Sequence, residues 1–290
     1  MSGSTPEVAD RPGLGGTGGD AKPPGMARAY RHSLVVRLTH WVNVLCLAIL
    51  LMSGLQIFNA HPALYWGEDS DFDTPVASIG AARTASGRAV GVTTVFGTAF
   101  ETTGVLGWSE VEGRPTRRAF PAWLTIPGYQ DLATGRVWHF FFAWVLVLNG
   151  AVYLTFSLTS GHLKRDLWPR REQWRTIGST FLDHLRLRFH QEREYNVLQR
   201  LSYLVVVFIL LPLMILAGLA MSPAVNAIAP WILDIFGGRQ SARTVHFVLA
   251  LFLVAFLVIH LAMVALSGLR ANLTAMITGR YGSDRKEGEQ

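Results

Sequence analysis

The chain has 290 residues, of which 50% are hydrophobic and only 16% are charged, and its mean hydropathy is +0.28. This composition argues against an ordinary soluble enzyme and favours several membrane spans joined by polar loops. The net charge of +6 does not indicate a nucleic-acid partner, because the basic residues are concentrated beside apolar segments, where membrane topology explains them.

The first predicted element is a tail, residues 1–29. It is rich in Gly and Pro and shows no apolar periodicity, so it cannot bury enough surface to offset the entropy of ordering the chain. We therefore expect it to be disordered. It also lacks the apolar stretch and cleavage site of a secretory signal peptide.

Four long apolar stretches follow, and each exceeds the roughly 20 residues that a helix needs to cross a hydrocarbon core of about 30 Å. They predict spans at about 35–58, 137–159, 200–222 and 243–269 within one membrane domain, residues 30–270. Because lipid offers no backbone hydrogen bonds, helices are the favoured form, and Pro212 predicts a kink rather than a break. The predicted fold class is all-α, an integral membrane four-helix bundle; the alternative is a soluble all-α protein with buried helices.

Basic residues predict the orientation of the bundle. Residues 160–199 and both terminal segments are rich in Lys and Arg, so the positive-inside rule places them, including the tail 271–290, in the cytoplasm. Within 160–199, the stretch EQWRTIGSTFLDHLRLRFH has apolar residues at helical spacing and a basic opposite face. It predicts a cytoplasmic amphipathic helix on the anionic inner leaflet, with a merely solvated helix as the alternative.

The connection 59–136 is predicted to lie on the outer face of the membrane. Loops of this length largely escape the positive-inside rule, so its arginines do not contradict that placement. A connection this long is rarely idle in a compact protein. We expect it to dock a partner subunit, and a disordered surface loop is the competing interpretation.

Histidines within the spans carry the predicted chemistry. His40, His139, His246 and His260 all lie in apolar stretches, where an ionisable or coordinating side chain is costly and therefore a functional candidate. One such residue alone could be a packing residue bonded to a carbonyl. The single Cys46 excludes a cysteine-ligated zinc or iron–sulfur site within the chain, and no Cys-x-x-Cys-His motif is present to attach haem covalently.

The spacing of these histidines predicts two pairs. His246 and His260 are 14 residues apart, so they project from nearly the same face of one helix, about 21 Å apart along its axis. His40 starts the first span at the inner side, and His139 starts the second span at the outer side. His40 therefore pairs with His260 and His139 with His246, and each pair can supply two axial imidazoles to one b-type haem.

Glycines and arginines extend the predicted haem sites. Gly54 lies on the face of His40 at the depth of the outer pair, and Gly150 lies on the face of His139 at the depth of the inner pair. Each offers a position without a side chain against a porphyrin, or else marks an ordinary helix–helix contact. The arginines at the span ends are candidate partners of haem propionates, although interfacial anchoring explains them equally well: Arg37, Arg136, Arg200 and Arg243.

These motifs resemble a known family. The four histidines, in RLTHW, GRVWHFFFAW and the last span, are similar to those of the di-haem cytochrome b subunits of bacterial hydrogenase, formate dehydrogenase and thiosulfate reductase, a cytochrome b561-like group. YNVLQRLSYL, GLAMSP and FGGRQSARTVHF most resemble the thiosulfate-reductase type. The resemblance covers roughly residues 30–270, and it is weak in the long outer connection.

The resemblance implies the cofactors, the partners and the location. Such proteins bind two haems b and pass electrons between quinone or quinol in the bacterial inner membrane and a partner subunit, often a periplasmic molybdopterin enzyme. Two other functions stay open on the sequence alone. One is a self-contained oxidoreductase such as a superoxide:quinone oxidoreductase or an ascorbate-type transmembrane reductase. The other is a non-haem transporter that uses its histidines as proton relays.

Overall fold

The structure is a computed structural model that describes residues 29–30, 32–163, 168, 174, 178 and 197–281. Its four longest apolar helices are α1 (Leu34–Phe58), α2 (Leu132–Thr159), the helical stretch Val197–Ala220 and α9 (Arg239–Leu266). Each is long and apolar enough to cross a membrane, and each begins and ends within a few residues of a predicted span. The predicted disordered tail, except its last residue, and nearly all of the amphipathic segment in 160–199 lie outside the described residues.

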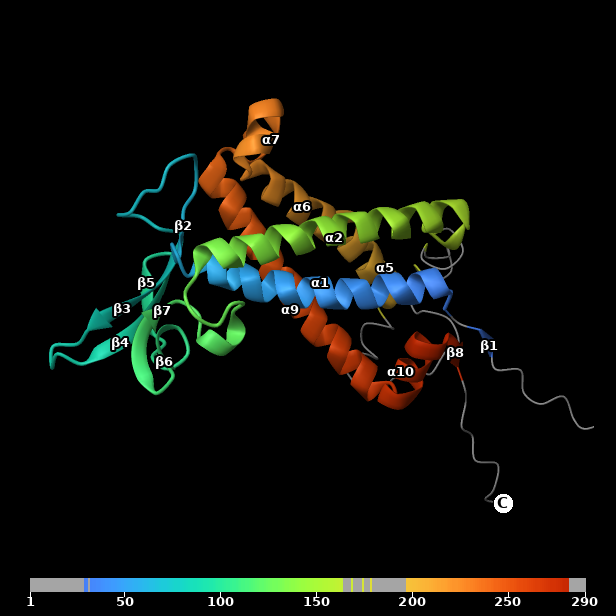
Figure 1. Ribbon diagram of the computed structural model, residues 1–290, viewed down its shortest axis with the longest axis horizontal. Coiled ribbons are helices and arrows are strands. Elements are labelled where there is room, and N and C mark those ends of the chain that lie inside the picture. Colours follow the sequence, from blue (N-terminus) through green and yellow to red (C-terminus); the bar gives the residue numbers. More distant parts are fainter. Residues whose placement is uncertain are drawn as a thin grey trace, which may run out of the picture.

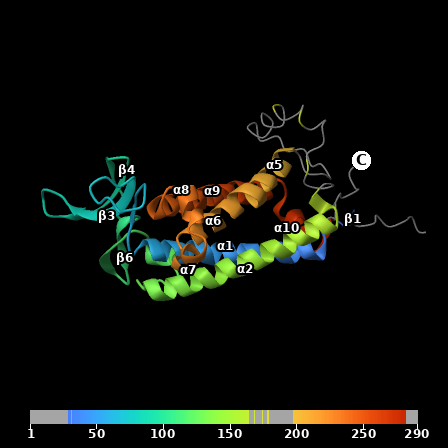
Figure 2. The ribbon, with the colours of Figure 1, turned by 90° about the horizontal axis from the view of Figure 1, so that it is seen from above.

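The spanning helices form two layers. In Figure 1, α1 and α2 run side by side, and α9 crosses them obliquely. The view from above shows α1 and α2 in one layer and α9 with α6 (Leu211–Ala220) in the other (Figure 2). Polar side chains join α1 to α2 inside the first layer, since Asn149 Nδ2 donates to the Thr39 carbonyl at 2.8 Å and to Asn43 Oδ1 at 2.7 Å. Such amide bonds between helices are typical of membrane bundles.

The third span continues through its proline. It is built from α5 (Val197–Val205), a single π-helical stretch η3 (Val206–Leu210) and α6, which carries Pro212 in its first turn. Pro212 has no N–H for the preceding turn, and a widened turn next to the proline absorbs that missing bond. The helix is therefore modified at Pro212 and not broken there.

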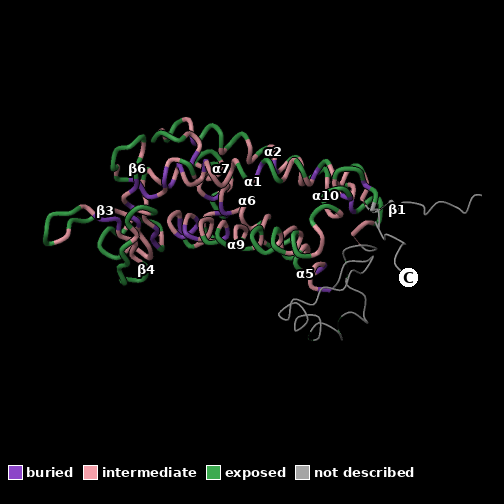
Figure 3. Tube along the Cα trace, turned by 90° about the horizontal axis from the view of Figure 1, so that it is seen from below, coloured by how far each residue is buried: buried purple, intermediate pink, exposed green. Residues whose placement is uncertain are grey.

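Apolar side chains of the spans point largely outward. Figure 3 shows that little of α1, α2 and α9 is buried. Leu148 on α2 is 65% exposed and Leu251 on α9 is 54% exposed. Large apolar surfaces of this kind are unfavourable in water but natural against acyl chains.

The connection between α1 and α2 is folded, so the all-α prediction is wrong for this part of the chain. It forms an antiparallel sheet in the order β2-β3-β4-β5 and a hairpin of β6 and β7. The strands are β2 (Ala63–Leu64), β3 (Ala77–Arg83), β4 (Ala89–Val95), β5 (Thr98–Glu101), β6 (Gly107–Val111) and β7 (Arg114–Arg118). A short 3-10 helix, η1 (Ala122–Leu124), leads towards α2. The interpretation of residues 59–136 as a disordered surface loop is therefore also wrong.

Local sequence explains these strands. The stretch AVGVTTV of β4 is rich in β-branched residues, and glycines close the turns on both sides of it. The hairpin crosses the sheet at Gly107, where φ is +81° and an added Cβ would lie 2.0 Å from the Gly80 carbonyl oxygen. Only glycine fits a position that has both a left-handed backbone conformation and so close a neighbouring carbonyl.

The sheet packs on the bundle through a small apolar core. Phe58 at the end of α1 contacts Leu64, Ile79 and Ala119 of the connection, and Phe247 of α9 packs against the same cluster. We call this end of the bundle the sheet end. The core fixes the folded connection to two spanning helices at once.

The first and last described strands meet at the opposite end of the bundle, which we call the terminal end (Figure 1). There β1 (Ala29–Tyr30) pairs antiparallel with β8 (Arg280–Tyr281). Helix α10 (Leu269–Thr278) occupies the start of the predicted tail 271–290, so that segment is helical up to Thr278 rather than a simple tail. Arg37 and Trp41 of α1 donate to carbonyls of α10, which fastens α10 to the bundle.

The start of α9 is capped by a distant segment. Two short helices, α7 (Pro223–Ile228) and α8 (Trp231–Phe236), lead from α6 to α9 at the sheet end. The Gly67 carbonyl accepts from the N–H groups of Gln240 and Ser241, and the Glu68 carboxylate accepts from the Arg239 N–H at 3.0 Å. These bonds satisfy N–H groups that a helix start leaves without partners, and they place a negative charge at the positive end of the helix dipole.

A buried guanidinium ties the connection to α1. Arg118 is 3% exposed and donates to the carbonyls of Phe120 and Gly128, at 2.7 Å each, and to Thr125 Oγ1 at 2.9 Å. It also reaches Gln56 Oε1 of α1 at 3.4 Å. All of these acceptors are neutral, and burial lowers the pKa of Arg118.

Replacing Arg118 with methionine is expected to destabilise the sheet end by about 3 kcal/mol, since several buried acceptors would lose their donor. Thermal unfolding of the protein in detergent should therefore occur at lower temperature than in the wild type. Arg88→Met is the matched control, because Arg88 lies on the surface in a solvent-exposed ion pair with Glu101. Equal unfolding temperatures for the two variants would contradict a structural role for Arg118.

Candidate metal centres

Four histidines from three spanning helices meet in two pairs. His40 of α1 lies beside His260 of α9, with ring centres 6.4 Å apart and ring planes at 59°. His139 of α2 lies beside His246 of α9, with ring centres 6.3 Å apart and ring planes at 65°. The first pair is at the terminal end and the second is at the sheet end. The structure thus brings together the residues that the helical spacing paired.

Aromatic rings surround the pair at the terminal end. The His40 ring makes an edge contact with Trp41, and the His260 ring stacks on Phe256 with ring centres 5.8 Å apart. Both imidazoles are half-buried. These contacts restrain the orientation of the two rings, which favours a fixed coordination geometry.

Hydrogen bonds define which nitrogen is free in the sheet-end pair. His246 Nδ1 lies 3.0 Å from the Met214 carbonyl, which can only accept, so Nδ1 carries the proton. His139 Nδ1 lies 3.1 Å from Ser53 Oγ, and Ser53 donates its own hydroxyl hydrogen to the Ile49 carbonyl at 2.6 Å. Ser53 therefore accepts from His139 Nδ1. Both rings keep a free lone pair on Nε2, as a metal-ligating histidine requires.

Two glycines make room for these rings. A Cβ added at Gly54 of α1 would lie 3.3 Å from His139 Cε1, and one added at Gly218 of α6 would lie 3.4 Å from His246 Cε1. Gly218 is four residues after Met214, so it shares the helix face that offers the carbonyl to His246. The glycines thus allow each imidazole to lie directly against the neighbouring helix.

Gly150 has a different environment. An added Cβ there would have no heavy atom within 4 Å apart from its chain neighbours and the backbone of its own helix. The position on α2 is thus free of close protein contact. Its predicted place against a porphyrin is compatible with this space and stays a prediction.

The spacing of the imidazoles fits a shared metal ion. Two imidazoles that bind one metal from opposite sides, with metal–nitrogen bonds of about 2.0 Å, have ring centres roughly 6 Å apart. Both observed distances agree with this value. Within the described ranges, no group of three or more His, Cys, Asp or Glu side chains is placed to hold a metal. Each pair offers two imidazole ligands, which suits a haem iron with its four porphyrin nitrogens.

The four candidate arginines divide between the two ends. Arg37 and the buried Arg200 lie at the terminal end, where Arg37 donates to the Ile277 carbonyl and Arg200 donates to the Trp168 carbonyl at 3.1 Å. Arg136 and Arg243 lie at the sheet end. Arg136 is exposed, with its guanidinium 5.5 Å from the centre of the Phe140 ring. Arg243 donates to the His61 carbonyl and lies 5.5 Å from the centre of the Phe58 ring.

Two guanidinium groups at the sheet end, those of Arg118 and Arg243, are largely shielded from solvent. Burial, and then the charge of Arg243, lower the pKa of His61, so this ring is neutral near pH 7. The ion pair recorded for the described part of the chain is Arg88–Glu101, far out on the sheet, so Arg243 and Arg118 have no carboxylate partner there. An anionic group bound at this end would be stabilised by these cations.

Sequence reasoning did not identify Ser53, Met214 and Gly218. The Met214 group is a backbone carbonyl, which no side-chain pattern can indicate. Gly218 stands inside GLAMSP, a stretch noted only for its resemblance to the family. Their roles depend on which helices become neighbours, and that information is in the tertiary structure alone.

Comparison with known proteins points to the same chemistry. The family model described as prokaryotic cytochrome b561 matches residues 31–279. The chain is also similar to the putative protein-methionine-sulfoxide reductase subunit YedZ1 of Azospira oryzae, with 30% identity over 250 residues. That alignment covers 86% of this chain and 96% of the relative. No solved structure matches the chain significantly.

Proposed function

The chain belongs to the prokaryotic cytochrome b561 family, and we propose that it relays electrons between membrane quinone and an extracytoplasmic redox enzyme through two bound haems b. The family assignment confirms the predicted resemblance and makes the chain a bacterial membrane haem protein. The observation that carries the proposal is the convergence of four imidazoles into two pairs with the spacing of shared axial ligands.

The donor set suits electron transfer rather than oxygen chemistry. A haem iron held by two imidazoles exchanges one electron at a time and has no open coordination position for oxygen. His139 and His246 are held by bonds from Nδ1 to Ser53 and Met214, so their ring orientations are fixed before any ligand arrives. Fixed ligands reduce the reorganisation that accompanies a change of charge at the metal.

The two histidine pairs also lie at different depths along the spanning helices. Helix α9 contributes His246 near the sheet end and His260 near the terminal end, about 21 Å apart along the helix axis. A free charge in the hydrocarbon core is strongly disfavoured. Two redox centres at different depths give an electron a route through that layer.

Arginines one turn from the ligands are proposed to bind haem propionates. Arg37, Arg136 and Arg243 each precede a candidate ligand by three residues, so each lies on the ligand face of its helix. Arg200 at the terminal end is a fourth candidate. Guanidinium groups bind carboxylates through paired hydrogen bonds, which would also help to fix the plane of the macrocycle.

The orientation and the partner are part of the proposal. The basic terminal segments support a cytoplasmic location for both termini, and the sheet end would then face the periplasm. The folded connection gives a periplasmic redox subunit, such as a molybdopterin enzyme, a structured surface on which to dock. The name of the Azospira oryzae relative describes a subunit of a methionine-sulfoxide reductase, so an enzyme that reduces oxidised methionine is the first partner to test.

Reduction by quinol tests the proposed function directly. The protein in lipid vesicles is expected to show a b-type spectrum. A short-chain quinol, added by manual mixing, should then reduce the haem. Reoxidation should then require an added periplasmic acceptor. Haem that stays oxidised in excess quinol would overturn the proposed electron exchange with quinone. A colourless protein would overturn the proposed haem binding and would favour a transporter that uses its histidines as proton relays.

Turnover by the chain alone distinguishes the remaining alternative. A superoxide:quinone oxidoreductase would transfer electrons from superoxide to quinone without any partner. We expect no such turnover, because the folded connection at the sheet end supports a docked protein subunit. Steady superoxide-dependent quinone reduction by the purified chain would reverse this preference.

A further inference from the structure

A histidine outside the two pairs lies next to Arg243 at the sheet end. His61 follows the end of α1, and its backbone carbonyl accepts from Arg243 Nη2. We propose that His61 and Arg243 together bind one carboxylate, a propionate of the haem held between His139 and His246. The inference rests on the proposed function, because it requires that haem, and it adds a second donor beside Arg243.

The His61 ring has a buried nitrogen without a partner. Its Nε2 atom is shielded from solvent, and no described residue forms a hydrogen bond with it. A buried polar atom that lacks a hydrogen bond costs about 1–3 kcal/mol. The rings of Tyr65 and Phe72 flank the imidazole, with ring centres 5.6 and 5.8 Å from its own. They restrain the ring without satisfying Nε2, which leaves this atom for a bound group.

The Arg243 guanidinium lacks a negative partner. It forms no ion pair with any residue in the described part of the chain, and its bond to His61 ends on a neutral carbonyl. Its Cζ atom lies 5.5 Å from the centre of the Phe58 ring. Partly apolar surroundings make a charge without a partner costly. A carboxylate at this place would gain charge-assisted hydrogen bonds from the guanidinium.

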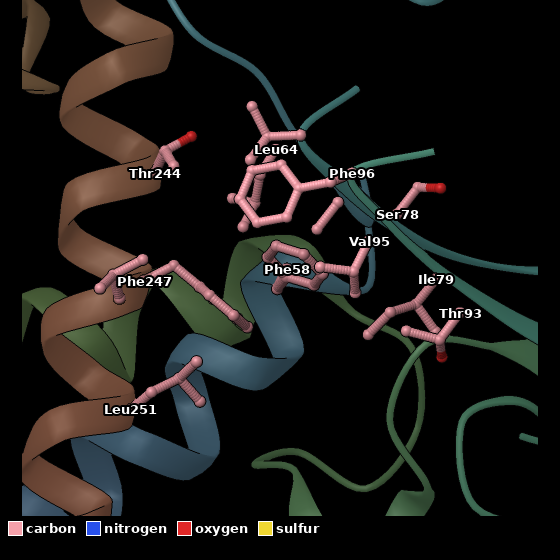
Figure 4. A pocket seen from close by; sticks show the side chains of 13 residues that line it. Phe58, Leu64, Ser78, Ile79, Thr93, Val95, Phe96, Thr244, Phe247 and Leu251 are labelled. Carbon is pink, nitrogen blue, oxygen red and sulfur yellow. The ribbon is translucent and has the colours of Figure 1, made fainter. Parts of the chain in front are cut away.

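The cavity beside Phe58 does not supply that carboxylate. Figure 4 shows it between α9, the end of α1 and the sheet, and its volume is about 260 Å³. Its lining consists of apolar side chains and three residues with hydroxyl groups, and neither His61 nor Arg243 belongs to it. The two polar groups therefore lie outside the cavity, and the cavity offers them no anion.

Arg243 lies between the sheet-end pair and the sheet. It precedes His246 by three residues, so it is about 4.5 Å nearer the sheet end along α9 and about 60° around the helix from the ligand. The long arginine side chain can span such an offset. Arg243 can therefore reach the edge of a macrocycle that is bound to His246.

His61 approaches the same edge from α1. It follows Gly54 by seven residues, and Gly54 lies against the His139 ring. The N–H groups of residues 59, 60 and 61 bond to carbonyls three or four residues earlier, so the helical winding of α1 continues to His61. Seven residues are close to two turns, which places His61 on the Gly54 side of α1 and nearer the sheet end. The bond to Arg243 then fixes the spacing of the two groups.

One carboxylate can satisfy both groups. A carboxylate has two oxygens that accept several hydrogen bonds, so it can accept from the guanidinium and from His61 Nε2 at once. A haem bound to His139 and His246 would carry its propionates at the edge of its ring. A propionate held by His61 and Arg243 would fix the rotation of the ring about the line between the two ligand nitrogens, which the axial imidazoles alone leave free.

Replacing His61 with phenylalanine tests the assignment, because it removes the donor and keeps a ring between Tyr65 and Phe72. A propionate that loses a donor stabilises the oxidised iron. At a fixed ambient potential we expect the ratio of reduced to oxidised sheet-end haem to fall by about threefold. Potentiometric titration of the whole protein measures this ratio, and the terminal-end haem is the internal reference. His61→Gln should recover part of the loss, since its amide can donate, and the matched control His162→Phe should leave the sheet-end haem unchanged.

Infrared difference spectra of the reduced and oxidised protein identify the anion. Cells fed aminolevulinate labelled at its carboxyl carbon make haem with labelled propionates. Bands that shift with the label therefore belong to a propionate and not to a protein carboxylate or a lipid phosphate. We expect the label-sensitive bands of His61→Phe to differ from those of the wild type, and those of His162→Phe to match them.

The outcomes separate this inference from the function on which it rests. An unchanged potential and unchanged bands in His61→Phe, with both haems bound, would overturn the assignment and leave the electron relay standing. A changed potential without changed bands would mean that the anion is not a propionate, which also overturns it. Wild-type protein without haem would overturn the inference together with the proposed function.

The two His61 variants separate hydrogen bonding from packing. Loss of the sheet-end haem from His61→Phe with its retention in His61→Gln would support the assignment. Equal effects of the two variants, on the potential or on haem retention, would mean that His61 only packs against its neighbours and would overturn the assignment.

Discussion

Replacing either His40 or His260 with alanine is expected to remove one and the same haem from the protein. The two imidazoles share one site in the structure, with ring centres 6.4 Å apart, and a haem that loses one axial imidazole loses a large part of its binding energy. His139→Ala and His246→Ala should remove the other haem. Each single variant is thus expected to retain about half of the wild-type haem per chain.

Haem quantitation and reduced-minus-oxidised spectra of all four variants provide the measurement. The remaining haem serves as an internal control for folding, since its band and its redox potential should stay close to the wild-type values. His162→Ala is the matched control, because His162 lies at the terminal end against Tyr153 and Phe156 and belongs to neither pair. If His40→Ala and His260→Ala lost different centres, the pairing would be wrong.

Double variants sharpen this test. Because His40 and His260 are assigned to one centre, combining their replacements should remove no more haem than either single change. Combining His40→Ala with His139→Ala should instead remove both haems. This difference in additivity depends only on which residues share a metal, and a general loss of stability would not reproduce it.

Helix periodicity was sufficient to predict the pairing of the histidines. A helix fixes the angle and rise per residue, so the spacing of His246 and His260 determines both their common face and their separation along α9. Apolar length determined the four spans in the same way. Helices α2 and α9 start earlier than predicted, because Asp131 caps α2 and the Gly67 segment caps α9 before the apolar stretches begin. Such caps lie in polar sequence, where apolar length gives no signal.

The fold of residues 59–136 could not be predicted from hydropathy. Its strands are short, and several residues of the sheet, such as Gly80 and Gly91, lie close to the backbone of the hairpin instead of showing an apolar alternation. What holds this region on the bundle is a set of long-range contacts, from Arg118 to Gln56 and from Phe58 to the cluster of Leu64, Ile79 and Ala119. Neither contact follows from the pattern around one residue.

Replacing Gly218 with leucine is expected to weaken the sheet-end haem selectively. The Gly218 position faces His246, and a side chain longer than a methyl group would push the imidazole away from the Met214 carbonyl. Loss of such a supporting hydrogen bond typically lowers metal affinity by about 10–100-fold. The Nδ1 bond also increases the basicity of the ligand, so any haem that remains should have a higher redox potential than in the wild type.

Gly54→Leu should have the same effect through His139, which lies 3.3 Å from the added Cβ. Ala255→Leu is the control, since Ala255 is an exposed residue of α9 and the change adds similar bulk away from both pairs. Haem content and a potentiometric titration of each variant give the answer. Gly150→Leu discriminates further, because its predicted place is at the other centre and its effect should fall on the haem that His40 and His260 bind. If Gly218→Leu and Gly150→Leu both reduced the content of the same haem, the two glycines could not lie at separate haems, and the roles assigned to them would be wrong.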